Sequence, residues 1–206
     1  AFNYATNGNV QATNWSTDWF FKKVDDADIA FSVKFSNSFS SLYLPYSVTL
    51  PEGIAAFTAV DVDGTDVTLV RVADTDDATE HGSVLPARTP AILYIDDESV
   101  EPAIFTFAYT ADNVALQEDV KAVLGTSLID GRILKSAIGC EDGYRYYKLG
   151  RKSGDEVSKM YWMYKEYSSD GTIAEGNAGT DKGGYISCSA NKIYMKVAES
   201  TAAGSF

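Results

Sequence analysis

Residues 60–72 read VDVDGTDVTLVRV, two runs of β-branched and apolar residues separated by Asp63-Gly64. An Asp-Gly loop between two such runs strongly predicts a β-hairpin, because glycine adopts the left-handed backbone that a tight turn requires. Asp61, Asp63 and Asp66 are also the residue type of a calcium loop, but the ligand order of an EF-hand is absent. We therefore expect a hairpin here and no metal site.

The same two-residue period continues on both sides of this hairpin. Residues 29–35 (IAFSVKF) place an apolar side chain at every second position, which predicts a strand with one face in a core. Further strands are expected at residues 91–95, 104–109, 133–134, 144–149, 160–167, 185–187 and 192–197. Only residues 114–124 (VALQEDVKAVL) have helical periodicity. The expected fold is all-β, an antiparallel β-sandwich of jelly-roll-like type with at most one short helix.

A short internal match predicts how this β fold is organised. Residues 85–94 (LPARTPAILY) and 188–195 (CSANKIYM) both place Ala and two polar residues before a strand, which predicts two pseudo-equivalent halves around one core. We expect a linker or the tail of a preceding domain at 1–28, the β-sandwich module at 29–198 and a C-terminal tail at 199–206. The linker holds an aromatic cluster that is either a ligand platform or a contact with an upstream domain of the same polypeptide: Trp15, Trp19, Phe20 and Phe21.

Charge and hydropathy exclude several classes of partner. A formal net charge of -12 repels phosphate backbones and anionic lipids, so we expect no nucleic acid partner. The longest apolar runs, such as residues 90–95, are far shorter than the roughly 20 residues that cross a bilayer, so we expect no membrane insertion. A neutral polysaccharide or oligosaccharide fits this charge better.

The chain has few residues for bond-breaking or metal chemistry. Its one histidine, His81, lies in an acidic loop, and most acidic residues stand in turns, where hairpin chemistry already accounts for them. Cys140 and Cys188 lack the CxxC spacing and neighbouring histidines of a zinc site. A disulfide in an oxidising compartment and two free buried thiols both remain open. We expect no enzyme activity, no catalytic residues, no cofactor and no metal.

Aromatic side chains are the best candidates for binding. Tyr and Trp rings stack on the C–H faces of sugars while polar neighbours hydrogen-bond the hydroxyl groups. Residues 160–167 (MYWMYKEY) are the richest cluster, and residues 144–147 would lie beside it across a hairpin with the loop 151–158. The candidate stacking residues are Trp162, Tyr164 and Tyr146, and the candidate polar neighbours are Glu166, Lys148 and Arg145. Packing of these aromatics in the core is the alternative.

Six segments together resemble a known module: residues 42–53 (LYLPYSVTLPEG), 85–90 (LPARTP), 124–126 (LGT), 147–150 (YKLG), 160–165 (MYWMYK) and 189–195 (SANKIYM). In this order they are similar to a recurrent C-terminal all-β module of large secreted proteins of Bacteroides-type gut and rumen anaerobes. Two positions depart from the family pattern, since Ser187-Cys188 replaces Ile-Pro and Met160-Tyr-Trp-Met replaces Gly-Phe-Tyr. The family has no established catalytic residues, so the resemblance carries no site over to this chain.

The resemblance implies an ancillary domain attached to glycoside hydrolases, polysaccharide lyases, repeat proteins or adhesins. We therefore expect a secreted or cell-surface, non-catalytic module of an extracellular polysaccharide-degrading protein, with a role in glycan binding or targeting. The alternative is a structural or adhesive spacer of a cell-surface protein with no glycan ligand.

Overall fold

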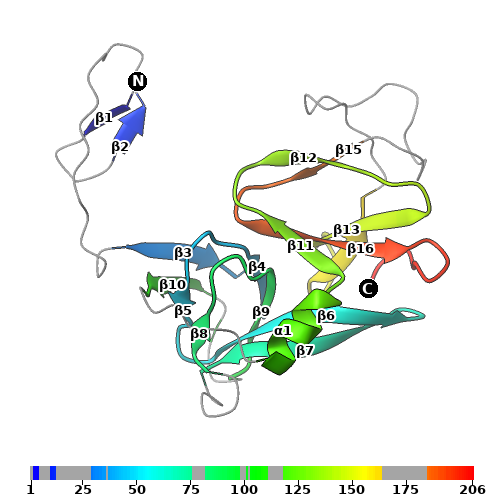
Figure 1. Cartoon of the computed structure of the whole chain (residues 1–206), viewed down its shortest axis with the longest axis horizontal. Helices are drawn as coiled ribbons and strands as arrows, with labels where there is room; N and C mark the ends of the chain where they lie inside the picture. The colour runs from blue at the N-terminus through cyan, green and yellow to red at the C-terminus, as the bar shows by residue number, and fades with distance from the viewer. Residues whose placement is uncertain are drawn as a thin grey trace.

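The computed structural model describes residues 2–4, 10–12, 29–35, 37–75, 82–97, 101, 103–110, 118–163 and 185–206 (Figure 1). Every strand pair in it is antiparallel, and the one helix, α1 (Glu118–Gly125), is short. The predicted all-β, sandwich-like fold is therefore confirmed. β1 (Phe2–Tyr4) and β2 (Val10–Ala12) pair with each other in a separate antiparallel sheet.

Four further sheets build the body of the module. Sheet I has the order β3 (Ala30–Lys34), β10 (Ile104–Tyr109), β5 (Val48–Thr49), β8 (Val84–Leu85). Sheet II has the order β4 (Phe39–Leu42), β9 (Ala91–Ile95), β6 (Ile54–Asp63), β7 (Asp66–Asp74). Sheet III has the order β11 (Ile129–Arg132), β16 (Lys192–Ala198), β13 (Tyr144–Gly150), β14 (Lys159–Trp162). Sheet IV pairs β12 (Ser136–Gly139) with β15 (Tyr185–Cys188).

The hairpin predicted at residues 60–72 is confirmed as β6–β7. Asp63 pairs with Asp66 around a two-residue loop, in which Gly64 has a φ of 60°. The β6–β7 register shifts between Ala59 and Asp61. Because this irregularity changes the alternation by one residue, Ala59 and Val62 both lie in the core between sheets II and III.

The sheets are stacked, and each interface between them has its own core (Figure 1). Phe107 of sheet I packs with Leu93 of sheet II, while the neighbouring Ile92 points to the opposite face and packs with sheet III. Sheet III alternates in the same way, with Met195 toward sheet II and Tyr194 toward sheet IV. The expectation of a single core is therefore wrong. The two central sheets, II and III, bury side chains on both of their faces, which gives three cores in series.

The strand order reveals that the two halves repeat one topology. β4-β9-β6-β7 in sheet II corresponds to β11-β16-β13-β14 in sheet III, and the pair β5–β8 corresponds to β12–β15. The two sets also follow the same order along the chain. The predicted pseudo-equivalent halves are thus present. Two strands of the first half, β3 and β10, have no counterpart among the described strands of the second half.

Matching backbone hydrogen bonds confirm this correspondence. The N–H of Arg88 donates to Leu44 O at 2.7 Å, and the N–H of Asn191 donates to Arg132 O at 2.7 Å. At the other end of each sheet, Gly53 and Gly143 have φ values of 72° and 81°. Their carbonyls accept the N–H groups of Asp96 at 2.9 Å and Glu199 at 2.8 Å.

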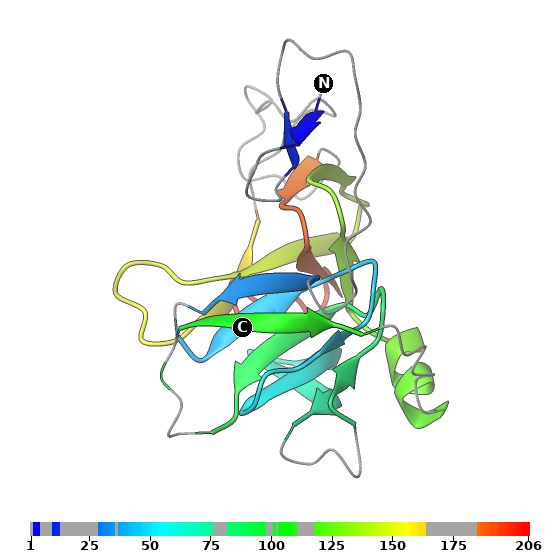
Figure 2. The same ribbon diagram turned by 90° about the vertical axis from the view of Figure 1, so that its left-hand side faces the viewer.

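The helix and the chain end show two differences from the sequence-based expectations. α1 begins at Glu118 and packs Val120 and Leu124 against the first core beside β6 (Figure 2); the predicted residues 114–117 lie outside the described part. Residues 199–206, expected to be a tail, continue the fold, since Phe206 exchanges backbone hydrogen bonds with Met160 at 2.8 and 3.0 Å and packs in the second core.

Candidate functional site

A groove of about 540 Å³ lies beside β12, on the face of sheet III that looks toward sheet IV. We call it the tyrosine groove, because Tyr144 and Tyr146 of β13 and Tyr194 of β16 line it. Four charged residues complete its polar lining: Asp130, Arg132, Glu141 and Lys196. β12 contributes Ile138 and Gly139, whereas no residue of β15 takes part.

The strand beside the groove has fewer partners among the described strands than its counterpart in the first half. In the first half, the corresponding edge, that of β5, pairs with β10, and Phe107 of β10 fills the core under sheet II. In the second half, β12 and β15 of sheet IV pack against Tyr146 and Tyr194 of sheet III. The groove lies beside β12, and no described strand pairs with β12 as β10 pairs with β5.

Three positions on the groove face of sheet III are charged, whereas the equivalent positions of the first half are leucines. The paired turns and strand registers align Leu42 and Leu44 of the first half with Asp130 and Arg132 of the second. Both leucines are almost completely buried, at 0% and 4% exposure, whereas Asp130 is exposed. On β9 and β16 the same alignment replaces Leu93 by Lys196. Charged side chains are costly to bury under a packed strand, so this face is suited to water or a polar ligand.

Asp130, Arg132 and Tyr194 form a closed hydrogen-bonded triangle at one end of the groove. The Tyr194 hydroxyl donates to Asp130 Oδ2 at 2.7 Å and accepts from Arg132 Nη2 at 3.0 Å. Arg132 Nη1 donates to the same carboxylate oxygen at 2.8 Å, and its guanidinium carbon lies 5.1 Å from the centre of the Tyr194 ring. Burial and the bond to Asp130 raise the pKa of Tyr194, so its hydroxyl stays a donor at neutral pH.

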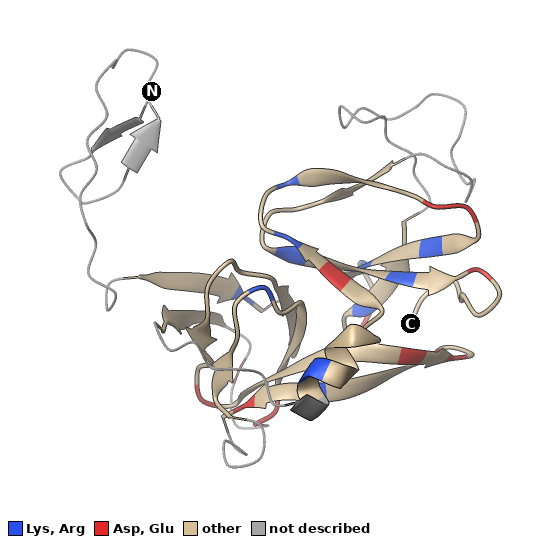
Figure 3. Cartoon of the chain, in the orientation of Figure 1, with Lys and Arg blue, Asp and Glu red and all other residues tan. Residues whose placement is uncertain are grey.

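A second ion pair holds the other end of the groove. Lys196 Nζ lies 2.7 Å from Glu141 Oε1 and 4.0 Å from the centre of the Tyr144 ring. The backbone N–H of Glu141 donates to the Tyr146 hydroxyl at 3.2 Å. The groove therefore carries two acids paired with two bases, and Figure 3 shows the two signs of charge side by side on sheet III.

The three tyrosines have different roles in the groove. Tyr146 and Tyr194 are 3% and 6% exposed and stack on each other with ring centres 6.1 Å apart, so they form the floor. Tyr144 is 38% exposed and is the ring available at the rim. Burial raises the pKa of the Tyr146 hydroxyl, which therefore also stays protonated.

The structure separates the candidate residues that the sequence grouped together. β13 and β14 form the predicted hairpin, but Trp162 pairs with Tyr147 and packs in the second core, on the face opposite to Tyr146. The Arg145 guanidinium lies over the Trp162 ring, with its carbon 4.3 Å from the indole centre. Lys148 lines a different pocket. Tyr164 and Glu166 lie outside the described residues, as do His81 and the cluster at Trp15 to Phe21.

Neither cysteine adds to this site. Cys140 and Cys188 are not joined by a disulfide, and burial raises the pKa of Cys188. Cys188 pairs with Ser136, four residues from Cys140 along β12, which corresponds to about 13 Å at the usual rise of a strand. That separation is too long for a disulfide between these strands.

Within the described ranges, no three His, Cys, Asp or Glu side chains form a group that could hold a metal ion. No helix among those residues is long and apolar enough to span a bilayer.

Most of the groove was missed by the sequence-based prediction, which included Tyr146 alone. Asp130 and Arg132 lie on β11, but the sequence placed the strand at residues 133–134 because Asp130 and Gly131 interrupt the apolar alternation. The alignment of these polar residues with the buried leucines comes from the strand registers and turn hydrogen bonds, which the internal match at residues 85–94 and 188–195 does not include. Comparisons of the chain with protein-family models, curated proteins and solved structures gave no match.

Proposed function

We propose that this chain is a secreted or cell-surface, non-catalytic module that binds a neutral oligosaccharide in the tyrosine groove and so targets an extracellular polysaccharide-degrading protein to its substrate. The observation that carries the proposal is that three positions on one face are leucine in the first half and charged in the second. Where the first half has Leu42, Leu44 and Leu93 under its own strands, the second has Asp130, Arg132 and Lys196 in an open groove.

The chemistry of the groove is suited to a sugar. Tyr144 offers an exposed ring for the C–H face of a pyranose, while the carboxylates of Asp130 and Glu141 can accept hydrogen bonds from its hydroxyl groups. Arg132 and Lys196 can donate to ring and hydroxyl oxygens. Their mutual ion pairs hold these side chains in place before binding, which lowers the entropic cost of ordering them.

The pairing of charges favours a neutral ligand over a charged one. Asp130 is matched by Arg132 and Glu141 by Lys196, so the four charged side chains sum to zero. An uncharged oligosaccharide can bond to all four without leaving a buried charge uncompensated. The net charge of -12 on the whole chain does not oppose such a ligand.

Affinity electrophoresis against a panel of neutral plant and host polysaccharides tests this proposal. We expect at least one polysaccharide to retard the wild-type protein. Tyr144→Ala should weaken that binding about tenfold, since loss of an aromatic stacking contact costs on the order of 1 kcal/mol or more. Tyr161→Ala is the matched control, because Tyr161 also carries a lysine ammonium on its ring, at 4.2 Å, but lies outside the groove.

The competing function is a structural or adhesive spacer, and the burial of Tyr146 and Tyr147 at 3% and 0% is the observation that favours it. A spacer predicts no retardation by any neutral polysaccharide. Equal weakening by Tyr144→Ala and Tyr161→Ala would also contradict binding in the groove. Circular dichroism of each variant distinguishes a loss of binding from a loss of fold.

A further inference from the structure

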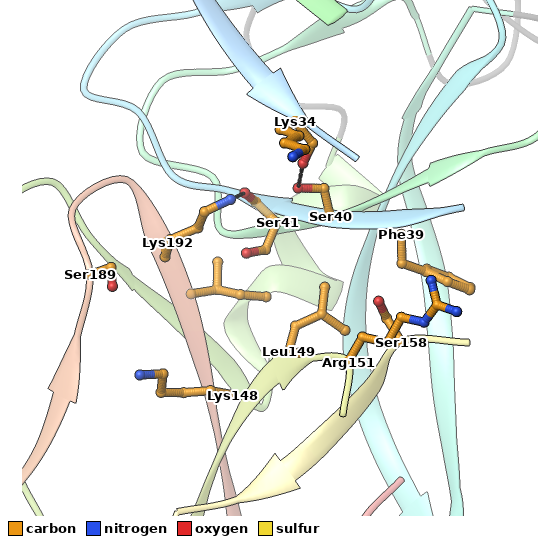
Figure 4. A pocket seen from close by; sticks show the side chains of 12 residues that line it. Lys34, Phe39, Ser40, Ser41, Lys148, Leu149, Arg151, Ser158, Ser189 and Lys192 are labelled. Atoms are coloured by element: carbon orange, nitrogen blue, oxygen red, sulfur yellow. Dashed lines mark hydrogen bonds between the residues drawn. The ribbon is translucent and has the colours of Figure 1, made fainter. Parts of the chain in front are cut away.

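A second pocket, of about 360 Å³, lies between the two halves of the fold (Figure 4). It shares no lining residue with the tyrosine groove. Lys34 of β3, Lys148 of β13 and Lys192 of β16 line it, together with Arg151, which follows β13. These cations come from strands far apart in the sequence, so the pocket forms only when the halves pack together.

The lining of this pocket contains no carboxylate. That is unusual in a chain with 29 acidic and 17 basic residues. Among the described residues, none of Lys34, Lys148 and Lys192 forms an ion pair. The nearby acid Asp155 is engaged by Lys159 at 3.7 Å and by the Tyr161 hydroxyl. The pocket therefore brings together three lysines that form no ion pair with a described side chain.

Two of these ammonium groups are held by backbone carbonyls. Lys192 Nζ donates to Ser41 O at 2.9 Å, and Lys148 Nζ donates to Ser187 O at 2.9 Å. A carbonyl carries only a partial charge and does not compensate the loss of hydration around an ammonium. Burial accordingly lowers the pKa of Lys192. An anion in the pocket would supply the missing charge.

Serine hydroxyls line the same space. They belong to Ser40, Ser41, Ser158 and Ser189 (Figure 4), and the Ser40 hydroxyl donates to Lys34 O at 3.2 Å. The Ser158 hydroxyl donates to Asn37 Oδ1 at 2.8 Å. Asn37 Nδ2 is buried without an acceptor among the described residues, so a donor next to the pocket wall is also unsatisfied.

We propose that this pocket binds a tetrahedral oxyanion, a sulfate or phosphate, either as the free ion or as an ester carried by a larger molecule. Its donors approach from β3, β4, β13 and β16, and a tetrahedral group presents oxygens in all of these directions. A carboxylate presents two oxygens in one plane and matches a guanidinium fork better than separated ammonium groups. Lysines act as point charges toward sulfate and phosphate.

NMR titration of the isotope-labelled chain with sodium sulfate and with sodium phosphate tests the proposal. Sodium chloride at the same ionic strength is the reference, because it removes screening from the comparison. We expect saturable shifts of the amides around Lys34, Lys148 and Lys192. Lys148→Gln and Lys192→Gln should each weaken the affinity about tenfold, as expected for loss of one charged hydrogen bond. Lys135→Gln removes an exposed charge outside the pocket and should change nothing.

Two further arms keep the test decisive. Lys192→Gln could disturb folding through the bond to Ser41. Lys34→Gln covers that case, because the Lys34 side chain forms no hydrogen bond with a described residue. Galactose 6-sulfate, compared with galactose and with inorganic sulfate, distinguishes an ester from the free ion. The proposal is overturned if sulfate and phosphate act like chloride, if all lysine variants bind as the wild type does, or if galactose alone produces the same shifts.

Discussion

Arg88 and Asn191 occupy equivalent turns of the two halves with almost the same left-handed backbone, φ 59° and 57°. Each follows an alanine and stands shortly before a central strand, β9 or β16. Each also donates its N–H, at 2.7 Å, to a carbonyl at the end of the neighbouring edge strand. Arg88 donates to Leu44, just after β4, and Asn191 donates to Arg132, the last residue of β11. The same turn therefore precedes an inner strand of the main sheet in each half, β9 in sheet II and β16 in sheet III.

The left-handed backbone at these turns predicts that glycine variants are more stable than alanine variants. A side chain with a Cβ costs about 1 kcal/mol or more in this conformation, whereas glycine adopts it freely. Arg88→Gly should therefore have a larger free energy of unfolding than Arg88→Ala, by about 1 kcal/mol, and Asn191→Gly should exceed Asn191→Ala similarly. Urea denaturation measures both pairs. Equal stability of the Gly and Ala variants would show that the turns are not strained.

At Gly131 of β11 the contact between the halves leaves no room for a side chain. A Cβ added there would overlap the ring of Tyr43, which belongs to the first half. Gly131→Ala should lower the free energy of unfolding by about 1–3 kcal/mol through overpacking. Gly139→Ala is the control, because its Cβ would meet Tyr185 at an ordinary 3.7 Å. Tyr43→Ala should remove most of the difference that Gly131→Ala makes, and a double-mutant cycle in urea measures that coupling.

The triangle in the tyrosine groove predicts a loss of stability in acid. Burial pushes the pKa of the Asp130 carboxyl up, but hydrogen bonds from Tyr194, the Gly131 N–H and Arg132 outweigh it and hold that pKa below 3.8. A lowered folded-state pKa stabilises the fold above the unfolded value and loses this effect as pH falls through the folded value. The loss should stay below about 1 kcal/mol, because the side chain is 53% exposed.

NMR titration of the Asp130 carboxyl checks this directly. Its pKa should move up in Tyr194→Phe, which removes one donor and keeps the ring. Asp130→Asn should have a weaker pH dependence of unfolding than the wild type below about pH 4. No change of the carboxyl pKa in Tyr194→Phe would contradict the role of the Tyr194 hydroxyl.

The lowered pKa of Lys192 predicts that sulfate binding weakens in alkali. Burial holds this pKa below 10.5, so the ammonium loses its charge at a lower pH than an exposed lysine does. The cations that face the same pocket are Lys34, Lys148 and Arg151; the nearby Cys188 thiol has a raised pKa, so it adds negative charge only at high pH.

Sulfate affinity measured by NMR should fall as pH rises through the Lys192 pKa, and Lys192→Gln should lack that part of the fall. Without a bound anion, the lowered pKa of Lys192 has the opposite effect on stability: the free energy of unfolding rises with pH. The unfolded chain binds more protons between the folded pKa and 10.5, so unfolding becomes harder as pH rises in that window. A pH-independent affinity up to pH 10.5 would contradict the prediction.

The local β structure was predictable because alternation is a property of neighbouring residues. Residues 29–35 and 60–72 alternate clearly and form β3 and the β6–β7 hairpin. The shared Ala-polar-polar motif before β9 and β16 was enough to predict two halves. The strand at β11 was misplaced, because its outward residues are charged and one inward residue, Gly131, has no side chain.

The candidate site was less predictable, because it depends on which strands lie beside each other. Alternation indicates that Tyr146 and Tyr147 point to opposite faces, but it does not show which face another sheet covers. Only the pairing of Tyr147 with Trp162 separated Trp162 from Tyr146.

The sequence by itself determined the clearly alternating strands, the tight turn at Asp63-Gly64 and the shared Ala-polar-polar entry into β9 and β16, since each depends on residues within a few positions of one another. The tertiary structure decided that β3 and β10 join β5 and β8 in the first half, whereas among the described strands β12 pairs with β15 alone. It also decided that Lys34, Lys148 and Lys192 meet in one pocket. The physical reason is that sheet order and packing come from long-range pairing, in which the same alternating strand buries or exposes a face according to its neighbour.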